Sequence, residues 1–192
     1  MTDSSAAATP TRASPPALVS PLPGEDFAAF FRATSAYVWS SLRRLGVGVA
    51  DLEDQSHETF LAMYRHRAAF DAARPLRPWV FAFALRVAAD YRKQAWHRRR
   101  PETLTHEPPA TTPAADDLVA ERQQREMIHE ALDALDLDRR AVLVMHELDG
   151  EAIPVVAQTL EIPLNTAYSR LRSAREQFSA ALKRAQARRG EP

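Results

Sequence analysis

The sequence predicts an all-α protein made of two small helical domains joined by a flexible, proline-rich linker. Apolar side chains recur at intervals of three and four residues through most of the chain, which is the spacing of a helix face. A stretch rich in proline and poor in large apolar residues, 101–115, interrupts this pattern. Only 5 glycines stand against 14 prolines among 192 residues, and neither GxGxxG nor GxxxxGKS/T occurs, which argues against a glycine-rich nucleotide-binding fold.

This composition divides the chain into five segments. Residues 1–23 are mainly Ala, Ser, Thr and Pro and are predicted to be a disordered tail, because they cannot bury enough apolar surface to offset the entropy of ordering. The first domain spans 24–99, the linker 100–116 and the second domain 117–186, and a short tail follows at 187–192.

We expect three helices in the first domain. The first spans 25–45, where phenylalanine, tyrosine and leucine residues line one face. The second begins at Asp51, a suitable N-cap residue, and ends near residue 71, because the prolines that follow disfavour helical geometry in the residues before them. The third spans about 79–98, with Pro78 in its first turn.

We expect four helices in the second domain. The first three span 118–135, 139–148 and 154–160, and a last helix, capped by Asn165, runs to about Arg184. Two short helices joined by a tight turn, of which the second is rich in arginine, are typical of the helix-turn-helix DNA-binding motif.

The 25 basic and 25 acidic residues give zero formal charge, which as a single sum argues against a nucleic-acid partner. The charges separate when they are counted by segment. Residues 74–100 hold eight basic side chains and one acid, and residues 170–189 hold seven and one. Ten carboxylates and two arginines lie in 102–138, and four carboxylates lie within 51–58. Each domain therefore contains one strongly basic helix.

The basic helix of the first domain also carries aromatic residues. This combination suits a nucleic-acid strand, because Arg and Lys pair with phosphates and exposed rings stack on unpaired bases. Trp79, Phe83 and Tyr91 share one helix face and are predicted to pack in the core. Phe81 and Trp96 lie off that face and are better candidates for contact with bases. The basic residues after Trp96 could also be exposed to solvent at the end of the helix, where their positive charge stabilises the helix dipole.

Residues 165–175 are predicted to be a recognition helix, with its polar residues toward base edges in the major groove. A solvated amphipathic helix would explain the same periodicity, but it explains the preceding short helix and proline-containing turn less well. The acidic residues of 51–58 suit a protein partner, although compensation of the helix dipole explains them about equally well.

No enzyme activity, cofactor or metal is expected. The chain has no cysteine, and its 6 histidines are scattered without HExxH or another ligand spacing. The longest apolar run, 79–85, is far shorter than the roughly 20 residues of a membrane span. The first residues contain no apolar export signal, so a cytoplasmic protein without membrane insertion is expected.

With these elements in order, the sequence resembles the bacterial RNA polymerase sigma factors of the extracytoplasmic-function (ECF) group, which contain only sigma regions 2 and 4. The resemblance covers about 25–182 and is carried by three stretches: DLEDQSHETFLAMYRHRAAFD, RPWVFAFALRVAADYRKQAWHRRR and LDALDLDRRAVLVMHELDGEAIPVVAQTLEIPLNTAYSRLRSAREQF. It implies that 24–99 is region 2, which docks on polymerase and recognises and melts the minus-10 promoter element. It also implies that 117–186 is region 4, whose helix-turn-helix reads the minus-35 element.

The resemblance implies a role for three sets of residues. Those that dock on the clamp helices of the largest polymerase subunit are Asp51, Asp54, His57, Glu58 and Phe60. Those on the minus-10 side are Phe70, Arg74, Arg77, Phe81, Arg86, Asp90, Lys93, Trp96 and Arg98. Those that face the minus-35 element are Asn165, Thr166, Tyr168, Ser169, Arg170, Arg172, Ser173 and Arg175.

The resemblance also implies the partners: core RNA polymerase, through the clamp helices and the flap of the second subunit, promoter DNA, and a cognate anti-sigma factor. Six positions depart from the family pattern, of which Ala152 and Pro154 stand where a polar cap and an acidic helix start are usual. His57 replaces a glutamine, Arg86 an asparagine of the base pocket, Glu161 a turn glycine and Tyr168 an arginine of the reading helix. These departures leave the identity of the promoter bases open.

The alternative function is a helix-turn-helix transcriptional regulator that binds DNA without polymerase. Such a regulator would account for 165–175. It would leave the first domain, with its acidic helix and its basic, aromatic helix, without a role.

Overall fold

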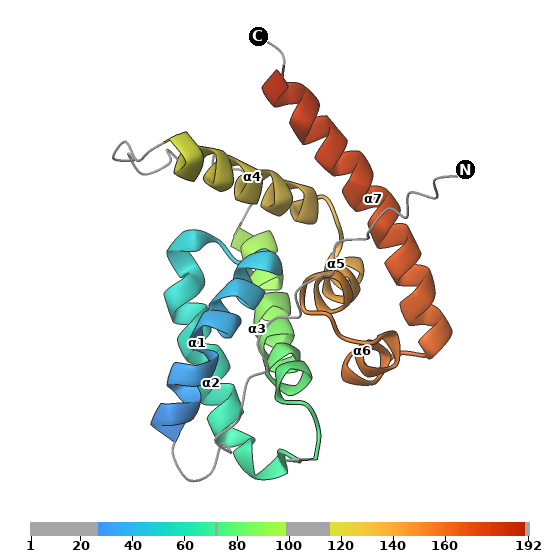
Figure 1. The fold of residues 1–192 in the computed structure, drawn as a ribbon. Coiled ribbons are helices and arrows are strands. Elements are labelled where there is room, and N and C mark those ends of the chain that lie inside the picture. The colour runs from blue at the N-terminus through green and yellow to red at the C-terminus, as the bar shows by residue number, and fades with distance from the viewer. Residues whose placement is uncertain (1–26, 72, 99–115, 191–192) are drawn as a thin grey trace, which may run out of the picture.

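The computed structural model describes residues 27–71, 73–98 and 116–190, and within these ranges it contains helices and no strand, which confirms the all-α class. The predicted tail 1–23 and all but the last residue of the predicted linker 100–116 lie outside the described residues. The helices form two groups (Figure 1). The first group is α1 (Phe27–Arg44), α2 (Leu52–Arg65) and α3 (Leu76–Arg98). The second is α4 (Asp116–Asp133), α5 (Leu137–Leu143), α6 (Ile153–Thr159) and α7 (Leu164–Gly190).

An aromatic cluster holds the first group together at the start of α1. Phe30 is fully buried, and its ring lies 6.3 Å from that of Phe60 on α2 and 6.4 Å from that of Trp79 on α3. Phe31 packs on Phe60 with ring centroids 4.4 Å apart. Truncation of a buried phenylalanine to alanine lowers the free energy of unfolding by about 3–5 kcal/mol. These few rings therefore stabilise the way in which the three helices cross.

The helix ends in the first group differ from the predicted ones at three places. The α2 helix ends at Arg65 and not near residue 71, and the other two differences lie at Asp51 and at the start of α3. A short 3₁₀ turn, Val49–Asp51, leads into α2, and it places Asp51 in helical rather than extended backbone geometry. The Asp51 carboxylate therefore does not cap α2; it accepts a hydrogen bond of 2.8 Å from the Tyr91 hydroxyl. The α3 helix begins at Leu76, so Pro78 lies in its first turn as expected.

Three predicted features of the second group are corrected. The α7 helix continues to Gly190, past the predicted end near Arg184 and into the predicted tail 187–192. The expected helix 139–148 is α5 followed by one π-helical turn, Val144–Leu148. The Pro163 carbonyl accepts the first backbone hydrogen bond of α7, from the Ala167 amide at 3.1 Å. Asn165 therefore lies inside the first turn of α7 and does not cap it.

The two helix groups pack against each other. Figure 1 shows α3 in the middle of the molecule, with α1 and α2 on one side and α5 and α6 on the other. The α4 helix packs along α7 and also contacts α1. Buried apolar residues of the two groups belong to one continuous core, so the packing between the groups excludes water as it does within each group.

The turn between α6 and α7 is a Schellman motif with a glutamate at the position that favours glycine. The amide of Glu161 donates to the Gln158 carbonyl at 3.2 Å, and the amide of Ile162 donates to the Ala157 carbonyl at 3.0 Å. Glu161 has a φ of 54°, in the left-handed region where a side chain with a Cβ atom is strained.

We predict that Glu161→Gly raises the free energy of unfolding by about 1 kcal/mol, because glycine adopts this backbone conformation without strain. Thermal or urea unfolding measures the change. Glu161→Ala is the matched control, since it removes the carboxylate but keeps the Cβ atom. Equal stabilisation by both substitutions would show that the charge, not the backbone, is the cause.

We also predict that stability falls as the pH drops below about 6.5, the usual pKa of histidine. Burial and the nearby Arg43 guanidinium lower the pKa of His129 on α4. The unfolded chain then binds more protons than the folded chain in this pH range, so protonation favours unfolding. Urea unfolding at pH 5.5 and 7.5 should show a smaller difference for His129→Gln than for the wild type. His57→Gln, at an exposed position, is the control and should keep the wild-type difference.

Candidate nucleic-acid and polymerase-binding surfaces

A cavity of about 510 Å³ opens beside the loop that joins α2 to α3. Its aromatic wall is formed by three rings in series: Phe70 lies 5.0 Å from Trp79, and Trp79 lies 4.8 Å from Phe83. Arg74 and Arg86 line the same cavity. Aromatic faces that stack on a base, together with guanidinium groups that pair with phosphates, are the chemistry that binds a single nucleic-acid strand.

The structure brings together only part of the predicted minus-10 set. Phe70, Arg74 and Arg86 line the cavity, whereas Asp90 and Lys93 form an exposed ion pair of 3.5 Å farther along α3. Arg77 lies outside the lining, with its guanidinium 5.4 Å from the centre of the Tyr37 ring. Trp96 and Arg98 are in α3, but their side chains lie outside the described residues.

The assignment of Phe81 to base contact is wrong for this structure. Phe81 is fully buried, because α3 packs on α1 and α2 on one side and on α6 on another and so needs apolar residues on more than one face. The predicted core packing of Trp79 and Phe83 is confirmed, since Phe83 is buried and Trp79 packs against the core. Sequence reasoning did not predict that both rings also line the cavity. Their proximity to the proline-rich loop was the available signal.

The face of α7 predicted to read DNA is exposed at its start. Ala167, Leu171 and Ala174 are buried against α5 and α6, which leaves the predicted polar residues on the other side. Those with exposed side chains are Asn165, Tyr168, Ser169, Arg172 and Arg175. Thr166, Arg170 and Ser173 are half-buried.

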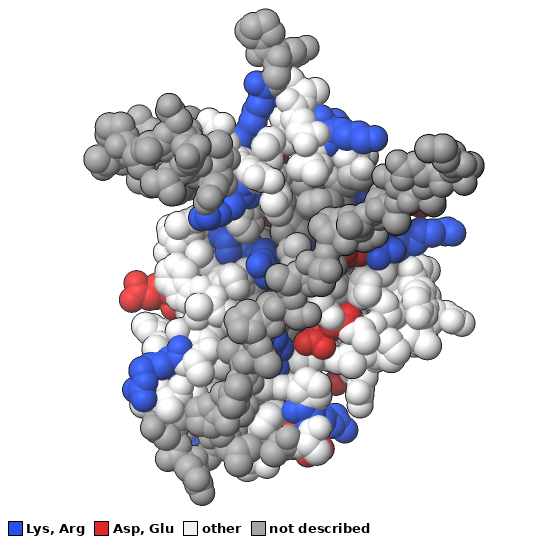
Figure 2. Space-filling view, in the orientation of Figure 1, with Lys and Arg blue, Asp and Glu red and all other residues white. Residues whose placement is uncertain are grey.

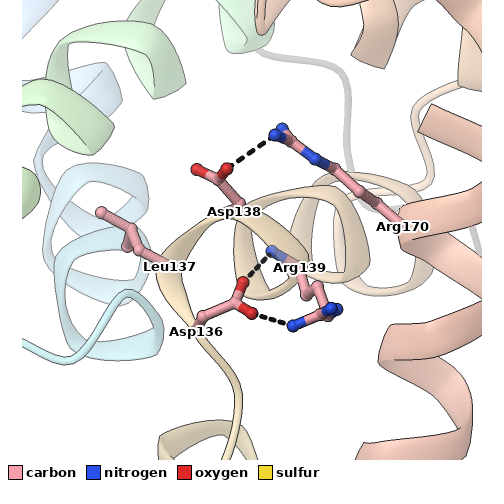
Figure 3. A pocket seen from close by; sticks show the side chains of 5 residues that line it. All are labelled: Asp136, Leu137, Asp138, Arg139 and Arg170. Atoms are coloured by element: carbon pink, nitrogen blue, oxygen red, sulfur yellow. Dashed lines mark hydrogen bonds and ion pairs between the residues drawn. The ribbon is translucent and has the colours of Figure 1, made fainter. Parts of the chain in front are cut away.

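Two arginines of this face, Arg170 and Arg175, form ion pairs with carboxylates of the second group, and Figure 3 shows the pair of Arg170. Arg170 pairs with Asp138 at 2.6 Å beside a cavity of about 380 Å³, and Asp136 pairs with Arg139 on the same rim. Arg175 donates from Nε to Glu147 at 2.8 Å. These carboxylates orient the guanidinium groups and reduce the positive charge that the face presents to DNA.

The predicted polymerase-docking residues divide into exposed and buried positions. Asp54, His57 and Glu58 are exposed on α2, but Phe60 is only 4% exposed inside the aromatic cluster. Phe60 therefore packs α2 against the aromatic cluster and is not part of the docking surface, so its predicted role there is wrong. Leu61 and Tyr64, which sequence reasoning did not assign to docking, are 49% and 45% exposed on the same helix.

On the face shown in Figure 2, basic residues lie over both helix groups, and acidic residues lie both at the left edge of the molecule and near its middle. In the described part of the chain, no set of three His, Asp or Glu residues is placed to hold a metal ion. None of its helices is both long and apolar enough to cross a bilayer.

Two family matches cover most of the helical residues. Residues 30–98 match Sigma-70 region 2, and residues 125–178 match Sigma-70, region 4. The ECF RNA polymerase sigma factor SigL of Mycobacterium tuberculosis is 31% identical over 146 residues, which cover 74% of this chain and 81% of the relative. The chain belongs to the ECF sigma factor family.

Other relatives agree with this assignment. The RNA polymerase sigma factor NccH of Alcaligenes xylosoxydans xylosoxydans is 26% identical over 75% of this chain and 80% of the relative. The sigma factor RpoE of Bartonella quintana, solved with the anti-sigma factor NepR, has a similar fold, with a TM-score of 0.61 at 18% identity. That likeness covers 83% of this chain and 98% of the RpoE chain.

The family assignment decides between the two functions that the sequence left open. This ECF sigma factor acts with RNA polymerase in promoter-specific initiation of transcription, and its region 2 match gives a role to the first helix group. A regulator that binds DNA without polymerase would not need that group. Sigma factors are initiation factors rather than enzymes.

Proposed function

We propose that this ECF sigma factor holds the unpaired minus-10 strand in the cavity lined by Phe70, Trp79 and Phe83. The observation that carries the proposal is the meeting of three aromatic rings and two arginines at one cavity. A base turned out of the duplex can stack against the rings while Arg74 and Arg86 pair with the adjoining phosphates.

We propose that the start of α7 reads the minus-35 element in duplex DNA. Its exposed polar side chains and Arg172 lie off the buried face that packs on α5 and α6, and they fit the major groove. Tyr168, where the family pattern has an arginine, is 54% exposed at the centre of this face. It offers apolar contact to a thymine methyl group in place of a bidentate contact to guanine.

The exposed acidic residues of α2 suit a basic protein surface, so we assign α2 to the clamp helices of the largest polymerase subunit. We assign the second helix group to the flap of the second subunit, and we expect a cognate anti-sigma factor to bind both groups. The protein then works in the cytoplasm beside polymerase, and no catalytic step, cofactor or metal is assigned to it.

The test adds the purified protein to core polymerase and maps transcripts on genomic DNA. We expect transcripts that begin at a limited set of sites with a shared pair of upstream elements. Failure to bind core polymerase, with binding to duplex DNA retained, would support the regulator instead.

We predict that Arg170→Ala weakens binding to minus-35 duplex by about 1–3 kcal/mol, as expected for loss of a contact to a base edge. The fold should persist, because a partly exposed ion pair such as Arg170–Asp138 contributes at most about 1 kcal/mol. Arg184→Ala, an exposed arginine farther along α7, is the control. Fluorescence anisotropy of labelled duplex measures both, and equal affinities for the wild type and Arg170→Ala would remove Arg170 from the reading face.

We predict that Arg74→Ala and Arg86→Ala each reduce the salt dependence of single-strand binding. A lost phosphate contact lowers the slope of log K against log salt by about 0.7 for a single strand. Titrations of single-stranded DNA at several salt concentrations give the slope, and Lys183→Ala on α7 is the matched control. A slope that stays at the wild-type value in both cavity variants would show that neither Arg74 nor Arg86 contacts a phosphate.

A further inference from the structure

A buried carboxylate joins the two helix groups. Asp149 follows the π-helical turn of the second group, and its side chain is only 3% exposed. Its carboxylate accepts hydrogen bonds from two side chains of α1 in the first group: the Tyr37 hydroxyl donates at 2.7 Å and the Arg44 guanidinium at 3.1 Å. Burial raises the pKa of Asp149, while the hydrogen bond from Tyr37 and the charge of Arg44 oppose that shift.

A buried guanidinium forms a second contact between the groups. Arg140 on α5 is 1% exposed and donates to Asp133 at 2.8 Å and to the Leu135 carbonyl at 3.2 Å. It also lies against Gly46, just after α1, where a Cβ atom would come within 2.4 Å of the guanidinium. Gly46 has a φ of 96°, so glycine is required there both for the backbone conformation and for the room it leaves to Arg140.

The second group also forms one wall of the cavity that we assign to the minus-10 strand. Val155, Gln158 and Thr159 of α6 line it opposite the aromatic rings of the first group, and Glu161 extends that wall. A carboxylate on this wall repels a phosphate, and the apolar and amide side chains occupy space beside the rings. The cavity is therefore narrower than it would be if the two groups separated.

We infer that this arrangement is a closed state in which α6 screens the minus-10 cavity, and that Asp149, Tyr37 and Arg44 form the latch that keeps it closed. The inference rests on the proposed function, because it concerns access to the same cavity. Release of the latch separates the groups and opens the cavity to a DNA strand. The apparent affinity of the free protein for that strand is then reduced by the fraction of molecules that are open.

The experiment measures the separation of the two groups in the full chain. The chain has no cysteine, so Ala33→Cys on α1 and Ser179→Cys on α7, both at exposed positions, accept a donor and an acceptor dye without competing sites. The labelled chain is compared with its Asp149→Asn and Tyr37→Phe variants. Glu130→Gln is the control, because it weakens the ion pair with Arg188 inside the second group and leaves the latch intact.

We expect larger dye separation in both latch variants and not in Glu130→Gln. We also expect the latch variants to bind random-sequence single-stranded DNA on the order of tenfold more tightly, since more molecules are open. Unchanged separation in helical, folded latch variants would overturn the latch. A second measurement needs no variant: adding the single strand to the labelled wild type should increase the separation, and binding without any increase would overturn the closed state.

The outcomes for the latch and for the proposed function are distinguishable. If the dyes separate as expected while core polymerase yields no specific transcripts, the latch stands and the proposed function fails. If specific transcripts form while neither the variants nor the single strand change the separation, the function stands and the latch fails.

Discussion

The burial of Asp149 constrains how the two helix groups can sit. A carboxylate removed from water is costly unless hydrogen-bond donors replace the lost solvent, and its donors, Tyr37 and Arg44, both lie on α1. The second group must therefore keep its π-helical turn against α1 whenever this carboxylate is buried. That single placement brings α5 to Gly46 and α6 to the rim of the aromatic cavity.

The chain has no net formal charge, and some of its positive charges are also neutralised locally by ion pairs. Arg170 and Arg175, on the face assigned to the minus-35 element, each pair with a carboxylate of the same helix group. Such pairing keeps the guanidinium groups oriented and lowers the long-range attraction to any phosphate backbone. Base contacts must then compete with these carboxylates, which favours sites where several contacts form at once. The cavity lined by the aromatic rings of the first group, which α6 screens, likewise lowers the affinity of the free protein for DNA.

Sequence reasoning succeeded where the physical signal was local. Helical periodicity, the prolines and the segregated charges indicated seven helices, the helix-turn-helix and the two basic helices. It was wrong at Phe81 and Phe60, where the number of faces that a helix buries decides whether a ring is exposed. It was also wrong at Asn165 and Asp51, because Pro163 and the preceding 3₁₀ turn changed where the helices begin.

By itself, the sequence determined the helical class and the order of the elements, because these depend on residues close together in the chain. Only the tertiary structure decided that Trp79 and Phe83 line a cavity and that Asp149 meets Tyr37 and Arg44. Asp149 and Tyr37 are 112 residues apart in the chain. Contacts at such separation depend on how the two helix groups exclude water between them, and no local pattern of residues encodes that packing.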